Sequence, residues 1–155
     1  MNRLMQASRA YQGEYRRMLD GYVITADQIV RDHVVLADRD GEVLGFYSLI
    51  ARGEPELDLM FVADAAQGMG LGAGLFRHMR AEAQRLGLAS VWIVSHPPSA
   101  GFYERMGAVR VGTRPACGRV TWERPVLVLP VRLPGTTSRS AVDSGVEPAL
   151  SAGRK

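Results

Sequence analysis

Residues 67–74 read Gln67-Gly68-Met69-Gly70-Leu71-Gly72-Ala73-Gly74, with a glycine at every second position. An alternating apolar run over 57–62 precedes this stretch, and a run over 75–86 with apolar residues at roughly helical spacing follows it. Glycines permit positive φ and close backbone approach, while the first amides of a helix lack internal partners and favour anions. The order strand, glycine loop, helix therefore predicts a loop that binds a pyrophosphate.

Two other nucleotide-binding motifs fit this loop less well. A phosphate-binding loop of the ATPase type ends in Gly-Lys-Ser/Thr, and Lys155 is the only lysine in the chain. A dinucleotide fingerprint can be placed on Gly68, Gly70 and Ala73. However, the next strand-like run ends in Ser95-His96, without the acidic residue expected about 20 positions on. The pattern R/Q-x-x-G-x-G/A describes the loop better.

That pattern, placed on Gln67, Gly70 and Gly72, resembles the acyl-CoA loop of the GNAT superfamily of N-acetyltransferases. Further along the chain, residues 99–108 resemble the family's A-x-x-F-Y-x-x-x-G-F/A segment. Upstream, two apolar runs joined across Asp40-Gly41 resemble the family's hairpin, and an Asp-Gly turn between such runs is a strong hairpin signal by itself. The resemblance covers residues 33–112 with the segments in the family's order.

The resemblance implies a single α/β domain whose sheet is mixed and mostly antiparallel, with helices on both faces. A chain of 155 residues with 46% hydrophobic content suits one such core. We expect the domain over residues 1–133 and, over 134–155, a tail that is disordered or loosely attached because it is rich in Ser, Gly, Thr and Pro. Family members begin with a strand, whereas residues 2–20 predict a helix. The first strand is therefore either absent or lost to a downstream start.

The remaining elements follow from periodicity and from turn residues. Thr25 followed by Gln28 predicts a capped second helix. We expect strands over 33–38, 43–50, 56–62, 90–95, 108–113 and 126–132, a long helix over 71–86 and a short helix over 99–106 that Ser99 could cap.

Charge and composition argue against several other classes of protein. The net charge of +3 is carried by arginines spread along the chain without a block of like charges, so we expect no nucleic-acid partner. No apolar run is long enough to cross a bilayer and no signal peptide is recognisable, so we expect a cytoplasmic protein with no membrane partner. The single Cys117 excludes an internal disulfide, and with three scattered histidines it predicts no metal site. We expect its thiol to be partly buried.

The resemblance also implies acetyl-CoA as co-substrate and assigns its contacts. Backbone amides of the loop would hold the pyrophosphate, which involves Gly68, Met69, Gly70, Leu71, Gly72, Ala73 and Gly74. The backbone of Met60, Phe61 and Val62 would pair with the pantetheine arm like an added strand. Gln67 stands where many members have arginine, so a neutral hydrogen bond would replace a charged contact.

Tyr103 matches the tyrosine that many members use as general acid toward the departing CoA sulfur, and its alternative role is packing beside Phe102. Three residues are candidates for the general base. Glu56 and Asp58 lie two apart, so a strand projects both to one face, and either could instead be a surface or acceptor-binding group. His96 follows a strand and has a usual pKa that suits a base, with a loop role as the alternative.

The acceptor would be a small-molecule or peptide amine, and the sequence does not choose between them. Tyr11, Tyr15 and Tyr22 lie where the family's first helices wall the acceptor pocket, with core packing as the alternative. The sequence is also compatible with a homodimer. A different class of function is also compatible with the loop, namely a catalytically inactive acyl-CoA-binding sensor or scaffold.

Overall fold

The computed structural model describes residues 1–131, and the tail expected over 134–155 lies outside them. The helices are α1 (Asn2–Ala7), α2 (Ala26–Arg31), α3 (Leu71–Arg85) and α4 (Ala100–Arg105). The strands are β1 (His33–Arg39), β2 (Glu42–Ile50), β3 (Glu56–Val62), β4 (Ser90–Val94), β5 (Val109–Arg114) and β6 (Arg124–Pro130). Each expected strand is present, with bounds shifted by a few residues at most.

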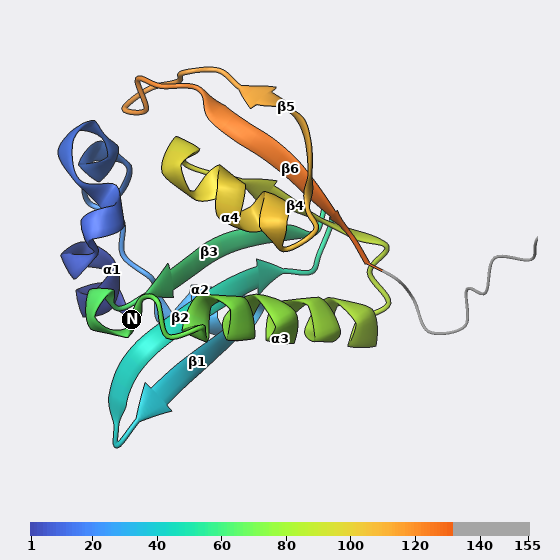
Figure 1. Ribbon diagram of the computed structural model, residues 1–155, viewed down its shortest axis with the longest axis horizontal. Coiled ribbons are helices and arrows are strands. Elements are labelled where there is room, and N and C mark those ends of the chain that lie inside the picture. The colour runs from blue at the N-terminus through green and yellow to red at the C-terminus, as the bar shows by residue number, and fades with distance from the viewer. Residues whose placement is uncertain (132–155) are drawn as a thin grey trace, which may run out of the picture.

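One six-stranded sheet has the order β1-β2-β3-β4-β6-β5 (Figure 1). All neighbours are antiparallel except β3 and β4, which are parallel and share a single registered pair, Glu56 with Trp92. Beyond that pair the two strands diverge toward their carboxyl ends (Figure 1). The sheet therefore opens between β3 and β4, and this opening positions the site.

Both faces of the sheet are covered, because neighbouring residues of a strand point to opposite sides. Tyr47 packs with Phe76 and Met79 of α3 in the larger core cluster. The adjacent Phe46 packs with Met5 and other residues of the amino-terminal segment in a second cluster. The expected α/β arrangement, a mostly antiparallel sheet with helices on both faces, is confirmed.

Gly45 allows α3 to begin close to the sheet. A Cβ at this position would lie 2.9 Å from Leu75 Cδ1 and 3.0 Å from the carbonyl oxygen of Phe61. The first distance involves the far end of a flexible side chain that can shift, and the second is tighter than most Cβ contacts, so glycine favours the close approach of α3 to β2.

A β-bulge interrupts β3 at Asp58. Ser48 pairs with Leu59 and Leu49 pairs with Leu57, which leaves Asp58 as the extra residue. Bulges bend a strand and redirect its side chains. Here the bulge lies next to the opening of the sheet.

The expected continuous helix over 2–20 is wrong. Helix α1 ends at Ala7, Ser8 adopts an extended conformation, and 3-10 turns follow over Arg9–Tyr11 and Gly13–Met18. Ser8 Oγ accepts a hydrogen bond from the Ala10 amide, and Gly13 has φ of +63°. A serine that bonds to its own local backbone competes with the helix, and a glycine at positive φ breaks it.

Of three smaller expectations, one is confirmed and two are wrong. Thr25 caps α2 as predicted, since its Oγ1 accepts from the Gln28 amide at 3.2 Å. Ser99 makes no capping hydrogen bond, because a 3-10 turn over Pro97–Ser99 precedes α4. Cys117 is exposed rather than partly buried.

Candidate functional site

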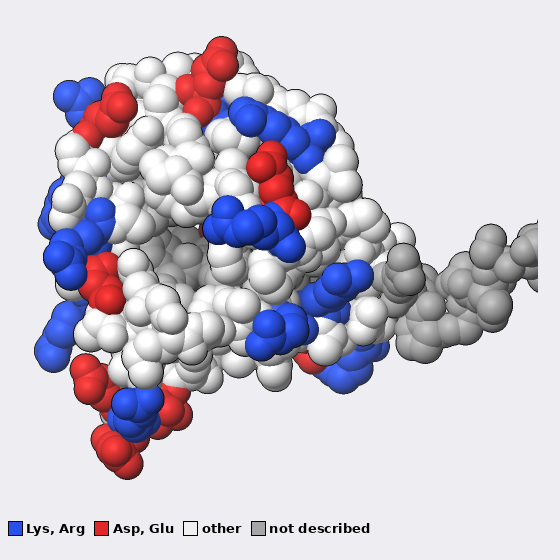
Figure 2. Space-filling view, in the orientation of Figure 1, with Lys and Arg blue, Asp and Glu red and all other residues white. Residues whose placement is uncertain are grey.

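Two connected cavities occupy the opening between β3 and β4. The larger one, the outer cleft, has a volume of about 520 Å³ and is the hollow on the face shown in Figure 2. The smaller one, the inner cavity, has a volume of about 130 Å³. Both are lined by the same five residues, namely Tyr11, Met60, Phe61, His96 and Tyr103. These five residues form the junction at which a ligand of one cavity meets a ligand of the other.

The glycine loop forms one wall of the outer cleft. Gly68 and Gly70 have φ of +76° and +80°, the left-handed region that glycine favours. Gly70 is the N-cap of α3, and neither a capping side chain nor an acidic residue occupies the first turn. The first amides of this helix thus have no internal partner and, together with the helix dipole, fit an anionic group such as a pyrophosphate.

The loop residues contribute unequally. Gln67, Gly68, Gly70, Gly72 and Ala73 line the outer cleft. The amide of Gly74 donates to the Gly70 carbonyl at 2.9 Å, which is the first turn of the helix. Its N–H is therefore used within α3. Met69, Leu71 and Gly74 are not among the lining residues of the cleft, and the Met69 side chain is exposed.

Met60, Phe61 and Val62 form the adjoining wall. Their backbone pairs with β2 on one side, while the described residues register β4 only at Glu56 on the other. The backbone edge of 60–62 that faces the opening is therefore available to an extended ligand, as an edge strand is.

Gln67 holds the loop in place through a hydrogen bond, and other residues supply the positive charge of the outer cleft. Its Nε2 donates to Asp64 Oδ1 at 3.1 Å. Asp64 also pairs with Arg9, whose Nε lies 3.0 Å from Oδ2. Arg105 lines the outer cleft and supplies a cation there. The pairing of Arg9 with Asp64 joins segments 55 residues apart, and no local pattern in the sequence indicates it.

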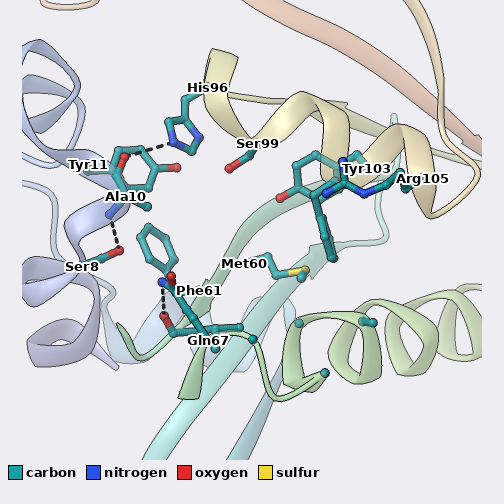
Figure 3. Close-up of a pocket in the computed structure, with 16 residues that line it drawn as sticks. Ser8, Ala10, Tyr11, Met60, Phe61, Gln67, His96, Ser99, Tyr103 and Arg105 are labelled. Atoms are coloured by element: carbon teal, nitrogen blue, oxygen red, sulfur yellow. Dashed lines mark hydrogen bonds between the residues drawn. The ribbon is translucent and has the colours of Figure 1, made fainter. Parts of the chain in front are cut away.

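Tyr103 projects from α4 into the junction. Its hydroxyl points toward Tyr11 across the cleft (Figure 3). Its ring packs against Phe102 and Phe76, with centroids 5.3 and 5.9 Å away, so it has the packing role as well. Burial raises the pKa of the Tyr103 phenol above its usual value. The group therefore keeps its proton at neutral pH and can act as a donor.

His96 lies on the opposite side of the junction and is 4% exposed. Its Nε2 is 3.2 Å from the carbonyl oxygen of Ala10 (Figure 3). A carbonyl can only accept, so Nε2 carries the hydrogen and Nδ1 keeps the lone pair when the ring is neutral. Burial lowers the pKa of His96 below its usual value, which favours the neutral ring at pH 7.

The two carboxylates occupy different places. Asp58 lines the inner cavity, and burial is the largest cause that raises its pKa. Glu56 lies at the closed end of the opening, opposite Trp92, and lines neither cavity, although burial and the nearby Asp58 raise its pKa too. Of the two, only Asp58 can contact a ligand in the cavities.

The broken amino-terminal segment supplies the aromatic wall. Tyr11 stacks on His96 with centroids 4.4 Å apart and on Phe61 at 5.3 Å. Tyr22 lines the inner cavity, whereas Tyr15 lies behind His96 in an edge contact at 5.6 Å. Tyr11 and Tyr22 thus wall the site, and Tyr15 supports it.

Within residues 1–131, no cluster of three or more His, Cys, Asp or Glu side chains is suited to a metal ion. The helices of this part of the chain are all too short or too polar to cross a membrane.

Comparison with known proteins finds acetyltransferases, both by family model and by structure. A family model described as an acetyltransferase (GNAT) domain matches residues 30–107, which is 78 of the 155 residues. No curated protein is significantly similar to the chain in sequence.

Many solved structures share the fold. The ribosomal-protein-S18-alanine N-acetyltransferase from Escherichia coli has a TM-score of 0.64 at 18% identity, over 87% of this chain and 88% of its own. A GNAT family acetyltransferase from Elizabethkingia anophelis with acetyl-CoA bound has a TM-score of 0.57 at 18% identity, over 67% and 79%. An aminoglycoside 6'-N-acetyltransferase complexed with coenzyme A has a TM-score of 0.61 at 15% identity, over 82% and 85%. At these identities the similarity shows the fold.

Proposed function

The chain belongs to the GNAT family of acetyltransferases, and from this premise we propose that it transfers the acetyl group of acetyl-CoA to an amine by direct attack. The observation that carries the proposal is the junction of the two cavities. A tyrosine that keeps its proton and a histidine that stays neutral line this junction together, beside a loop fitted to a pyrophosphate. Two of the structural neighbours hold acetyl-CoA or coenzyme A, which supports the co-substrate.

The binding roles follow from the walls of the outer cleft. The amides of the loop and of the first turn of α3 would bind the pyrophosphate, and Arg105 would add a positive charge. The backbone of 60–62 would pair with the pantetheine arm and place the thioester at the junction. The bound co-substrate supplies an activated acetyl group.

The chemical roles follow from the two groups at the junction. His96 Nδ1 would take a proton from the acceptor ammonium, directly or through water, so that the neutral amine can attack. As the carbon–nitrogen bond forms and the carbon–sulfur bond breaks, the Tyr103 hydroxyl would protonate the leaving thiolate, and the proton that the new amide nitrogen loses would restore that hydroxyl, directly or through water. Asp58 is a weaker candidate for the base because it lines only the inner cavity, and Glu56 is weaker still because it lines neither.

A thioester-consumption assay tests the proposal. Purified protein with acetyl-CoA should release free thiol when amines of several classes are added in turn, with mass spectrometry to detect the acetylated product. Reactions without amine give the background rate of hydrolysis. Tight binding of acetyl-CoA without transfer to any amine would contradict the proposed enzymatic activity and favour a binding module. No feature of the site specifically supports a binding module.

A further inference from the structure

The charge on the side chains that line the inner cavity is of one sign, negative. Among the described residues that line it, Asp58 is the only carboxylate, and none is lysine or arginine. The other lining side chains are mainly aromatic or aliphatic. An acceptor with its own carboxylate would find no cationic partner in this cavity and would meet Asp58 there.

Asp58 is held in place by a chain of hydrogen bonds. Gln28 Nε2 donates to Asp58 Oδ2 at 3.1 Å and lies 3.0 Å from the Tyr22 hydroxyl. Gln28 is itself 7% exposed and belongs to the capped first turn of α2. The carboxylate is therefore positioned before any ligand arrives, which favours binding because little ordering is left to do.

The negative charge of Asp58 is incompletely balanced by the protein. Burial and the neighbouring Asp32 raise the pKa of its carboxyl, and they outweigh Arg31 and the hydrogen bond from Gln28, which lower it. The nearby Arg31 is engaged with Asp32, with its Nε and Nη2 each 3.0 Å from a carboxylate oxygen. A cation bound in the cavity would stabilise ionised Asp58.

The size of the cavity limits the ligand. A volume of about 130 Å³ corresponds to the space of about four water molecules in the liquid and lies below the range of pockets for drug-sized ligands. Asp58 lies two residues before Met60, which lines the junction. At a regular strand rise of about 3.3 Å per residue the two positions are at most about 7 Å apart, because the bulge at Asp58 shortens the advance of the strand, and this span corresponds to about four methylene groups.

Building on the proposed function, we propose that the acceptor is a short aliphatic diamine. One ammonium binds Asp58 at the inner end of the cavity, the methylene chain packs against Tyr11, Tyr22 and Phe61, and the other nitrogen faces the thioester at the junction. That nitrogen gives one proton to His96 before it attacks the thioester carbon. The nitrogen still carries one excess proton after the attack. As the carbon–sulfur bond breaks, the thiolate takes the proton of Tyr103, and the excess proton of the nitrogen restores the Tyr103 hydroxyl, directly or through water. The inner ammonium keeps its charge throughout.

Calorimetry on the protein saturated with coenzyme A tests the inference without turnover. Butane-1,4-diamine should bind about 10²-fold more tightly than butylamine, which has the same carbon chain and no second charge. In Asp58→Asn this preference should fall to a few-fold. Asp40→Asn, which removes an exposed carboxylate on the β1–β2 turn, should keep the full preference.

A length series on the unmodified protein gives a second measure. Diamines with two to eight carbons should show tightest binding near four, because Gln28 and Tyr22 hold Asp58 at a fixed distance from the junction. Equal affinity for diamine and monoamine, the same preference in Asp58→Asn, or a flat length series would each overturn the inference. If the enzyme acetylates butylamine while these results are obtained, the proposed function stands and only the diamine is wrong. If the diamine binds as expected and no amine is acetylated, the proposed function is wrong and the inner cation site stands.

Discussion

The outer cleft and the inner cavity lie on either side of the same junction, yet they are built in opposite ways. Half of the residues that line the outer cleft come from one stretch of chain, residues 60–74, where glycine conformations and helix amides provide backbone binding groups. The inner cavity is made of side chains from four separate segments, and its one charge is Asp58. A backbone site of this kind binds a group common to a whole family, whereas a side-chain site can change with each sequence and set specificity.

The two cavities also differ in the charge they favour. The amino terminus of α3 and Arg105 make the outer cleft suitable for anions. Asp58 makes the inner cavity suitable for a cation. Tyr103 and His96 lie at the junction, so substitutions there should affect the reaction without strongly affecting binding on either side.

The largest effect is expected for Tyr103→Phe. Removing only the hydroxyl keeps the ring contacts with Phe76 and Phe102 but removes the proton donor. The turnover number should fall about 10²- to 10⁴-fold while acetyl-CoA affinity stays within a few-fold. Steady-state kinetics and calorimetry on the same sample measure both. Turnover close to that of the unmodified enzyme would assign Tyr103 to packing alone.

His96→Gln should lower kcat/KM by about 10²-fold, because glutamine can still donate to the Ala10 carbonyl but offers no base of suitable pKa. The pH profile is the sharper measurement. A base acts when unprotonated, and burial lowers the pKa of His96, so kcat/KM of the unmodified enzyme should level off below the usual histidine range. That inflection should vanish in the variant. An inflection that persists in His96→Gln would move the base to another group.

Gly70→Val tests the outer cleft against a matched control on the same helix. Gly70 and Gly87 flank α3, have φ of +80° and +71°, and have no atom within 4 Å of an added Cβ. Valine at either position should therefore cost about 1–3 kcal/mol of stability through backbone strain. Only Gly70→Val should also weaken acetyl-CoA binding, by about tenfold or more as the loop is displaced. Equal acetyl-CoA affinities in the two variants would show that the glycine loop does not bind the co-substrate.

The smallest effect is expected for the stability of Asp58→Asn. A folded-state pKa raised by burial means that the ionised carboxylate opposes folding once pH exceeds the usual carboxyl range. Asparagine removes that cost and can still accept from Gln28. The melting temperature of the ligand-free variant should therefore rise by about 2–4 °C at pH 7, and the gain should shrink as pH falls toward 4. A lower melting temperature at pH 7 would mean that the carboxylate stabilises the fold.

The sequence predicted most of the sheet, because strand and hairpin signals are local. The Asp40-Gly41 turn, the alternating run before the loop and the helical run after it all concern residues within a few positions of one another. The bounds of β3 and α3 match the expectation to within one residue. The prediction of a continuous helix over 2–20 failed. The apolar spacing of this segment is compatible with a helix, but the backbone conformations of Ser8 and Gly13 interrupt it.

For the site, residue identities could be predicted but relative positions could not. Tyr103, His96 and Asp58 were all candidates, yet nothing in the sequence ranked the three candidate bases. The ranking depends on the bulge at Asp58 and on the divergence of β3 from β4, which place Asp58 in the inner cavity and leave Glu56 outside both. A bulge is set by cross-strand pairing, which periodicity within one strand does not reveal.

The sequence by itself determined the glycine loop that leads into α3, because glycine conformations and free helix amides are properties of consecutive residues. Only the tertiary structure decided the acceptor side. The carbonyl of Ala10 selects the hydrogen-bonding nitrogen of His96 across 86 residues, and Gln28 reaches Asp58 across 30. These contacts form only when the amino-terminal segment packs on the sheet. Burial there, which no short stretch of sequence contains, moves the pKa values of His96 and Asp58 in opposite directions.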